Sequence, residues 1–168
     1  MELLFERISG SLERKAFDCG VDSLNDYLKR YALQNLKKNV GVTIVAVAAQ
    51  QPKKILGYYS ASMAQVEFSR LPEDLSKDLP RYPVPAMRIG RLAVDRSAQG
   101  QGLGAALLRD ALLRALQLSH EVGTCMVLVD ALDEKAKAFY ARYGFLPLTD
   151  LPLTLILPVK TIATAFGE

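Results

Sequence analysis

The chain has 168 residues, a formal net charge of +3, one histidine and two cysteines, and half of its residues are hydrophobic. This length and composition predict a single globular domain over residues 1–168 rather than a disordered chain. No apolar run approaches the roughly 18 residues that a membrane-spanning helix needs, and the acidic N-terminal segment does not resemble a signal peptide. Cys19 and Cys125 are expected to be free thiols, and the single His120 gives little basis for a metal site. We therefore expect a cytoplasmic protein with no metal and no membrane partner.

The first predicted helix begins near Ser23, because Ser23 to Asp26 resemble a capping box in which Asp replaces Glu. Beyond it, apolar residues recur at helical spacing and leave a second, mostly basic face. The apolar face comprises Leu24, Tyr27, Leu28 and Tyr31, and the second face comprises Arg30, Gln34, Lys37 and Lys38. A β-branched run then predicts a strand over residues 42–48, which a turn at residues 51–54 joins to a partner strand over residues 55–67.

The second half of the chain alternates strands with helices. The prolines in residues 70–87 predict a long loop with one helical turn, and such a loop is more often functional than idle. The elements that follow are a strand over 88–94, a helix over 103–118, a strand over 125–129, a helix over 133–143 that ends at Gly144, and a strand over 153–159. This order predicts an α/β domain with a mixed sheet.

A glycine-rich turn joins the strand over residues 88–94 to the helix that follows it. Its sequence runs from Gln99 to Gly104 and contains three glycines. The first amides of a helix have no partner inside the helix, and the helix dipole adds positive charge there. Glycines also let the backbone approach an anion closely. We therefore expect the turn to hold a pyrophosphate group.

The same turn also satisfies the loose dinucleotide pattern G-x-G-x-x-G/A, which would bind NAD. However, Asp95 to Gln99 separate the strand from the first glycine, whereas a Rossmann strand runs almost directly into it. The acidic residue at the end of the next strand, Asp130, lies thirty positions after Gly100 instead of the expected ~20. These spacings disfavour NAD.

Three segments together resemble the GNAT N-acetyltransferase family. The turn resembles the family's Q/R-x-x-G-x-G/A acetyl-CoA signature, Arg91–Val94 resembles the strand before it, and Ala138–Phe145 resembles the closing helix and turn. The resemblance implies an α+β fold in which helices flank a mixed, mostly antiparallel sheet, with two central strands splayed around acetyl-CoA. It also implies a set of residues that bind this cosubstrate: Leu92, Ala93 and Val94 at the pantetheine arm, Gln99, Gly100, Gln101, Gly102, Leu103, Gly104 and Ala105 at the pyrophosphate, and Asp133 and Phe139.

Tyr140 is the predicted catalytic residue. Transfer of an acetyl group from a thioester to an amine needs a protonated leaving thiolate, and a phenol with a pKa of about 10 can supply that proton. The resemblance assigns this role to Tyr140, because the family commonly has a catalytic tyrosine at this place in the closing helix. The alternative is that Tyr140 is a core aromatic residue without a chemical role. We expect Tyr143, one turn further on, to serve packing.

Segments outside this region resemble a narrower group, the bacterial GNAT toxins of toxin–antitoxin pairs. They are Phe17–Gly20, Ser23–Asn25, Tyr27–Leu28, Gly57–Tyr59, Leu79–Pro85 and Leu157–Ile162, so the resemblance covers nearly the whole chain. It implies acetylation of the α-amine of the amino acid on charged tRNA, which stops translation. It further implies a homodimer, neutralisation by a ribbon-helix-helix antitoxin, and contact with operator DNA only through the antitoxin complex.

Local charge is compatible with an RNA substrate, whose backbone is an array of phosphates. The candidate RNA-contacting residues are Lys29, Arg30, Lys37, Lys38, Arg88 and Arg91, although Arg91 could instead be an internal ion-pair partner. Two alternatives stay open. One is a GNAT enzyme that acetylates a small-molecule amine or a protein N-terminus, and the other is a non-catalytic binding module. The absence of acidic residues over 79–94 disfavours a cationic substrate, and the intact glycine turn together with Tyr140 disfavours the binding module.

Overall fold

The computed structural model describes all residues from 1 to 168. Its seven strands form one sheet in the order β1-β2-β3-β4-β5-β7-β6, in which β4 and β5 are parallel and the pairs β1–β2, β2–β3, β5–β7 and β6–β7 are antiparallel. The predicted mixed, mostly antiparallel sheet is therefore confirmed. The elements in chain order are β1 Leu3–Arg7, α1 Asp22–Asp26, the π-helical turn η1 Tyr27–Tyr31, α2 Ala32–Lys37, β2 Val42–Ala48, β3 Gly57–Val66, η2 Phe68–Arg70, α3 Glu73–Ser76, β4 Val84–Val94, η3 Arg96–Ala98, α4 Leu103–Ser119, β5 Met126–Asp130, α5 Glu134–Ala141, β6 Leu146–Leu148, β7 Leu151–Pro158 and α6 Val159–Ala165.

The chain forms two compact units, and the boundary between them falls within β3, β4 and α4. Unit 1 comprises residues 1–62 and 90–111, and unit 2 comprises residues 63–89 and 112–168. That the 168 residues act as a single domain stays a prediction. None of the helices has both the length and the hydropathy that crossing a membrane requires.

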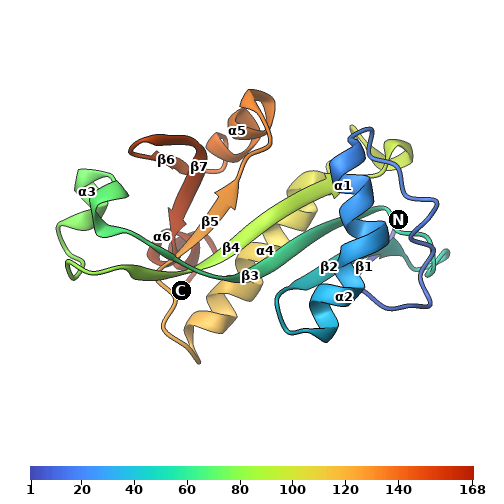
Figure 1. Ribbon diagram of the computed structural model, residues 1–168, viewed down its shortest axis with the longest axis horizontal. Helices are drawn as coiled ribbons and strands as arrows, with labels where there is room; N and C mark the ends of the chain where they lie inside the picture. The colour runs from blue at the N-terminus through green and yellow to red at the C-terminus, as the bar shows by residue number, and fades with distance from the viewer. The chain divides into compact units, whose positions relative to one another are not determined.

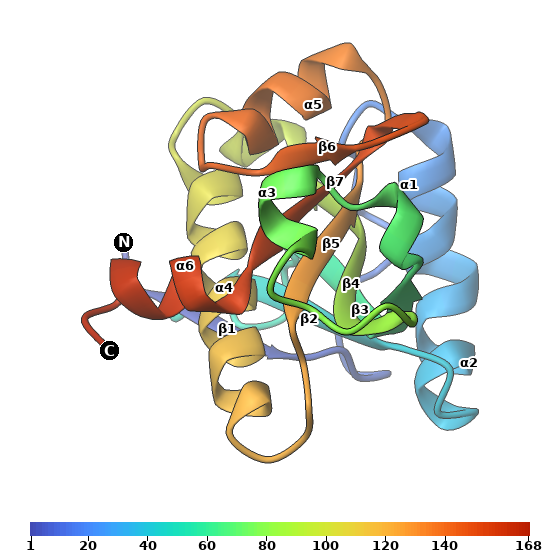
Figure 2. The ribbon, with the colours of Figure 1, turned by 90° about the vertical axis from the view of Figure 1, so that its left-hand side faces the viewer.

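In unit 1, helices cover both faces of the strands (Figures 1 and 2). Alternate residues of β2 and β3, among them Val45, Val47 and Tyr58, pack with Tyr27 and Leu28 of the first helical segment. The opposite face belongs to α4, which comes so close that the Cβ atom of any residue replacing Gly57 would lie 2.8 Å from Leu107 Cδ1 and 3.0 Å from the Ala93 carbonyl oxygen. This close approach explains why β3 begins with a glycine.

In unit 2, strands β5, β7 and β6 carry a second core. On one face Met126, Leu128 and Ile156 pack with residues of the 66–84 segment, including Leu71 and Val84. The other face of β7 packs against α5 and the turn that ends it, and Gly144 approaches Leu157 there. Figure 1 shows α5 beside β7, with α6 continuing directly from the end of that strand.

The first helix differs from its prediction in two respects. It begins at Asp22 after Val21, and Ser23 makes no capping hydrogen bond, so the predicted capping box is wrong. Tyr31 is 51% exposed, although its spacing predicts a place on the buried face. The reason is the π-helical turn, in which the N–H of Ala32 donates to the carbonyl oxygen of Tyr27, five residues back. The extra residue shifts the buried stripe so that Ala32, at 0% exposure, takes the place expected for Tyr31.

Several boundaries also differ. β4 begins at Val84, four residues before the predicted start, even though it includes Pro85. A proline is tolerated near the start of a strand because its missing N–H is not needed there, and the Pro85 carbonyl oxygen still accepts a hydrogen bond of 2.9 Å from the Cys125 N–H. Three short elements, β1, β6 and α6, had no predictive signal in the sequence, and the longest of them has seven residues.

Candidate functional site

The glycine turn, residues Gln99–Ala105, leads from η3 into α4. Gly100 and Gly102 have φ angles of +77° and +84°, which few other residues adopt. A Cβ atom on either glycine would have no atom within 4 Å, so both open onto unoccupied space. The six consecutive N–H groups from Gly100 to Ala105 donate to no protein acceptor. Such a row of amides at the start of a helix binds an anion with several oxygen atoms.

A buried carboxylate stabilises the turn through hydrogen bonds. Asp95 is 8% exposed and accepts three hydrogen bonds: from the Asp18 N–H at 2.9 Å, from the Ser97 N–H at 3.0 Å and from the Ser97 hydroxyl at 2.6 Å. Burial alone would raise the pKa of Asp95, but the hydrogen bonds from Ser97 and Asp18 hold it below its usual value. Asp95 therefore stays ionised and ties the 17–20 loop to the turn.

Gln99 strengthens the same connection. Its side-chain amide donates to the Cys19 carbonyl oxygen at 3.0 Å and to the Val94 carbonyl oxygen at 2.9 Å. Its backbone N–H already has a long contact of 3.5 Å with the Arg96 carbonyl oxygen. Gln99 thus shapes the turn from inside the protein, and the N–H groups available to an anion begin at Gly100.

The remaining predicted cofactor residues of unit 1 are contiguous with the turn. Ala93 is buried, and Leu92 and Val94 are half-buried at the end of β4. Leu103 is 4% exposed, so its side chain belongs to the core and only its backbone is available to a ligand. The structure places these residues on the strand and helix that flank the glycine turn.

The tyrosine cluster of unit 2 comprises Phe139, Tyr140, Tyr143 and Phe145. The Tyr140 ring meets Phe139 and Phe145 edge to face, with centroids 5.2 and 5.6 Å apart, and Tyr140 is only 4% exposed. Its hydroxyl makes no hydrogen bond with another protein group. Burial raises the pKa of Tyr140 well above its usual value, and the negative charge of Asp130 raises it further. Tyr140 is therefore a fully protonated phenol at neutral pH.

The neighbours of Tyr140 have distinct structural roles. Asp133 is the N-cap of α5, since its carboxylate accepts a 2.9 Å hydrogen bond from the Ala136 N–H. Phe139 is half-buried between the rings of Tyr140 and Tyr143. Tyr143 packs edge-on against Phe139 but is 43% exposed, so it is a peripheral packing residue.

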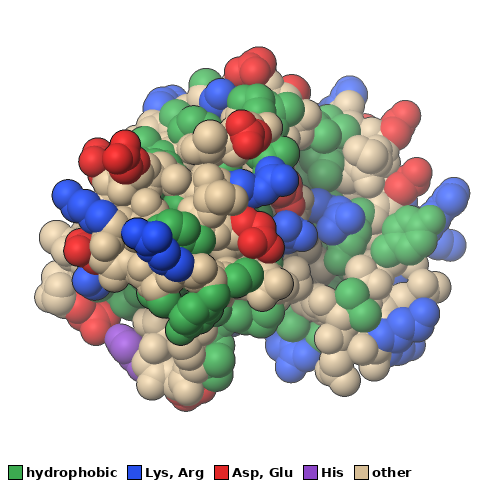
Figure 3. Space-filling view, turned by 60° about the vertical axis from the view of Figure 1, so that its left-hand side comes forward, with side chains coloured by type: hydrophobic (Ala, Val, Ile, Leu, Met, Phe, Trp, Pro, Cys, Tyr) green, Lys and Arg blue, Asp and Glu red, His purple; other side chains and the backbone are tan.

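The six predicted RNA-contacting residues fall into different environments. Arg88 forms a salt bridge of 3.3 Å with Asp130, which compensates part of its charge. Arg91 has no ion pair, and its guanidinium lies 3.7 Å from the centroid of the Tyr27 ring. Arg30, Lys37 and Lys38 are exposed, whereas Lys29 is half-buried. Basic and acidic side chains are interspersed over the face drawn in Figure 3.

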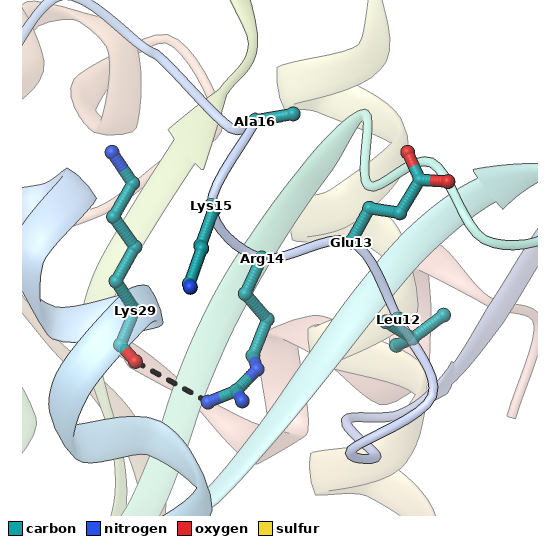
Figure 4. Close-up of a pocket in the computed structure, with 6 residues that line it drawn as sticks. All are labelled: Leu12, Glu13, Arg14, Lys15, Ala16 and Lys29. Atoms are coloured by element: carbon teal, nitrogen blue, oxygen red, sulfur yellow. Dashed lines mark hydrogen bonds between the residues drawn. The ribbon is translucent and has the colours of Figure 1, made fainter.

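Lys29 lines a pocket of about 400 Å³ that was not predicted from the sequence. We call it the basic pocket; its lining residues are Leu12, Glu13, Arg14, Lys15, Ala16 and Lys29 (Figure 4). The only signal in the sequence is the Arg14-Lys15 pair directly before the 17–20 segment. Such a pair does not reveal that the neighbouring helix supplies a third cation.

The side chains of the protein do not form a metal site or an activated thiol. No group of three or more His, Cys, Asp or Glu residues could hold a metal ion. Cys19 and Cys125 are free thiols, as predicted, and burial raises the pKa of both. Both are therefore poor nucleophiles at neutral pH.

Sequence comparison relates the chain to acetyltransferases. A family model described as an acetyltransferase (GNAT) domain matches residues 41–147. The chain is 35% identical over 162 residues to a Mycobacterium tuberculosis protein named tRNA-acetylating toxin, a match that covers 96% of this chain and 95% of the relative. It is 30% identical over 163 residues to the probable toxin TacT of Sinorhizobium fredii, with 92% and 90% covered.

Solved structures give the same relationship. A mutant of KacT superimposes with a TM-score of 0.93 at 34% identity. AtaT in complex with acetyl-methionyl-tRNAfMet superimposes with a TM-score of 0.92 at 31% identity. Both comparisons cover 99% of this chain and 100% of the other. A mutant of the toxin AtaT bound to acetyl-CoA and to the C-terminus of the antitoxin AtaR has a TM-score of 0.84 at 29% identity, with 99% of each chain covered. A KacTA–DNA complex has a TM-score of 0.80 at 33% identity, with 98% of each chain covered.

Proposed function

Because this chain belongs to the GNAT acetyltransferase family, we propose that it transfers the acetyl group of acetyl-CoA to the α-amine of the amino acid on charged tRNA. Blocking that amine prevents peptide-bond formation, so the protein would act as a toxin that stops translation. The proposal treats residues 1–168 as one catalytic domain.

The observation that carries the proposal is the row of six N–H groups from Gly100 to Ala105 without a protein acceptor. A diphosphate offers several oxygen atoms to such a row, and the glycines at Gly100 and Gly102 leave the space that it needs. These residues fit the pyrophosphate of acetyl-CoA, and the backbone of Leu92, Ala93 and Val94 would pair with the pantetheine arm. Acetyl-CoA supplies the activated acetyl group when it is bound.

Tyr140 would provide the proton that the leaving thiolate requires. Its phenol is protonated at neutral pH because burial raises its pKa, and its hydroxyl is not engaged by another protein group. No strong base is required, since an α-amine with a pKa of about 7.7–8.0 is partly neutral at pH 7. Phe139 and Asp133 would serve acetyl-CoA binding through the position of α5.

The choice of substrate follows from the relatives. One of them is named a tRNA-acetylating toxin, and AtaT has been solved with acetyl-methionyl-tRNAfMet. Basic residues of this chain, Lys29, Arg30, Lys37, Lys38, Arg88 and Arg91, are the candidates for contacts with the tRNA backbone. Arg88 is the weakest of them because Asp130 compensates its charge.

The relatives also suggest partners. AtaT binds the C-terminus of its antitoxin, and a KacTA complex binds DNA. For this chain we propose a cytoplasmic homodimer that a ribbon-helix-helix antitoxin neutralises, with operator DNA bound only through the antitoxin complex.

Labelled acetyl-CoA tests the function. The protein is incubated separately with charged tRNA, uncharged tRNA, a polyamine panel and a peptide with a free N-terminus. We expect label on charged tRNA alone, recovered as an N-acetyl amino acid after mild alkaline hydrolysis of the ester. Label on polyamines or on the peptide would replace the proposed substrate, and no transfer to any acceptor would contradict an enzymatic function.

A further inference from the structure

The basic pocket lies between the loop before Phe17 and the π-helical turn η1. It holds about 400 Å³ and is lined by three basic side chains, Arg14, Lys15 and Lys29, but by one acidic side chain, Glu13. Figure 4 shows the Glu13 carboxylate directed to the opposite side from Lys29. The pocket is therefore a concave surface on which positive charge predominates.

Arg14 is held in place within the pocket. Its Nη1 atom donates a 3.2 Å hydrogen bond to the carbonyl oxygen of Lys29, and its side chain is half-buried. A guanidinium group has five N–H donors in a fixed plane, so this bond orients the group and leaves the others for a ligand. The same bond ties the loop to η1, so the backbone of Lys29 lies next to the Arg14 guanidinium. A cation fixed in this way loses less side-chain entropy on binding than a mobile one.

The basic side chains of the pocket are not tied up in close ion pairs. None of Arg14, Lys15 and Lys29 takes part in a salt bridge. A bound anion would be attracted by each of these cations. An arginine fork matches two oxygen atoms of a phosphate, and lysines add charge without a strict geometry. The lining thus fits a phosphate group better than a small neutral ligand.

We propose that the basic pocket binds a backbone phosphate of the tRNA substrate, with Arg14 as the oriented contact and Lys15 and Lys29 as supporting charges. This inference rests on the proposed function and adds two residues, Arg14 and Lys15, to the candidates for substrate binding. The loop that carries them continues directly into the 17–20 segment, which is hydrogen-bonded to the glycine turn. A phosphate in the pocket would therefore position the RNA relative to the element that holds acetyl-CoA.

Salt-dependent binding tests the proposal. Affinity for charged tRNA is measured from low to moderate salt for the full-length wild type and the double variant Arg14→Gln/Lys15→Gln. The control, Lys77→Gln/Lys160→Gln, removes two positive charges from exposed positions outside the pocket. Each lost phosphate contact lowers the slope of log affinity against log salt by about 1. We expect the pocket variant to bind about tenfold more weakly with a slope reduced by about 1–2, and the control to match the wild type.

Two further measurements keep the test decisive. Lys15→Gln alone changes an exposed side chain that takes no part in the Arg14–Lys29 bond, so its smaller slope change, about 1, reports the lost charge and not a change in that bond. Acetyl-CoA affinity should be equal in all variants, and a loss there with tRNA binding unchanged would assign the pocket to a phosphate of the cosubstrate and overturn the proposal. If the wild type acetylates charged tRNA while the pocket variant matches the control, only the pocket proposal fails. If the wild type labels no charged tRNA, the proposed function fails, and the pocket proposal fails with it.

Discussion

The glycine turn and the tyrosine cluster prepare their chemical groups by opposite physical means. In the glycine turn the functional atoms are backbone N–H groups, which become available because Gly100 and Gly102 adopt positive φ angles and α4 begins there. The supporting contacts are polar, and the buried Asp95 carries a charge stabilised by three hydrogen bonds. In the tyrosine cluster the functional atom is a side-chain hydroxyl among aromatic rings, and burial acts directly on its pKa.

This difference predicts how each region responds to mutation. A ligand bound by several amides loses only part of its affinity when one backbone position is strained, because the other amides remain. A reaction that depends on a single proton loses most of its rate when that one oxygen atom is removed. The glycine turn should therefore control binding, and the tyrosine cluster should control turnover.

The largest expected effect is that of Tyr140→Phe. The substitution removes the proposed proton donor and should lower turnover by roughly 10²–10⁴ while leaving acetyl-CoA affinity unchanged. The fold should tolerate it, because the Tyr140 hydroxyl bonds to no protein group and its loss leaves no partner unsatisfied. Steady-state kinetics and calorimetric titration with acetyl-CoA measure the two quantities.

Tyr143→Phe is the matched control, since it removes the same atom from the exposed member of the cluster. It should retain wild-type turnover.

Because the pKa of Tyr140 is raised, the phenol stays protonated at alkaline pH, and the wild-type rate should rise through about pH 8 as the acceptor amine loses its proton. Equal turnover of Tyr140→Phe and the wild type would remove Tyr140 from the mechanism.

The sequence predicted the glycine turn better than it predicted the tyrosine cluster, for a physical reason. Glycine spacing and the start of a helix are local features, so a glycine turn that leads into a helix could be predicted over residues 99–104. The strand over residues 42–48 was also predicted with its observed bounds, because β-branched runs are a local signal. The pKa shift of Tyr140 depends on burial and on Asp130, ten residues away, which periodicity does not report.

Non-local contacts explain the remaining differences. No supporting role for Asp95 could be predicted from the sequence, because one of its partners, Asp18, lies 77 residues earlier in the chain. The π-helical turn at Tyr27–Tyr31 shifts the buried face by one residue, and a helical-period argument assumes that no such turn exists. The basic pocket combines Arg14 with Lys29, which lies fifteen residues further on, so no single motif contains it.

The second prediction concerns the glycine turn itself. Gly102→Ala places a Cβ atom on a residue with φ of +84°, which costs about 1–2 kcal/mol and would be relieved by moving the turn away from its binding geometry. Acetyl-CoA affinity should fall about 5- to 30-fold in calorimetric titrations, while turnover at saturating acetyl-CoA should change much less. Gly123→Ala is the control, because Gly123 has no positive φ and a Cβ atom there meets nothing within 4 Å. A fall in turnover with unchanged affinity would contradict the division between binding and chemistry.

The smallest expected effect concerns the support of the turn. Asp95→Asn keeps the side-chain shape but removes the charge that accepts hydrogen bonds from Ser97 and the Asp18 N–H, so stability at pH 7 should fall by about 1–2 kcal/mol. Since the folded pKa of Asp95 lies below its unfolded value of about 3.9, its contribution is complete above pH ~4 and is lost as the pH falls through the folded pKa.

Urea unfolding at a series of pH values should therefore show the wild type and Asp95→Asn converging below about pH 4, because the variant has no carboxylate to protonate at this position. The exposed Asp78→Asn control should follow the wild type at every pH. A constant difference between wild type and Asp95→Asn down to pH 2 would mean that the negative charge of Asp95 is not what supports the turn. In that case the glycine turn would not depend on a buried charge, and the contrast between the two regions would be limited to the atoms that meet the ligand.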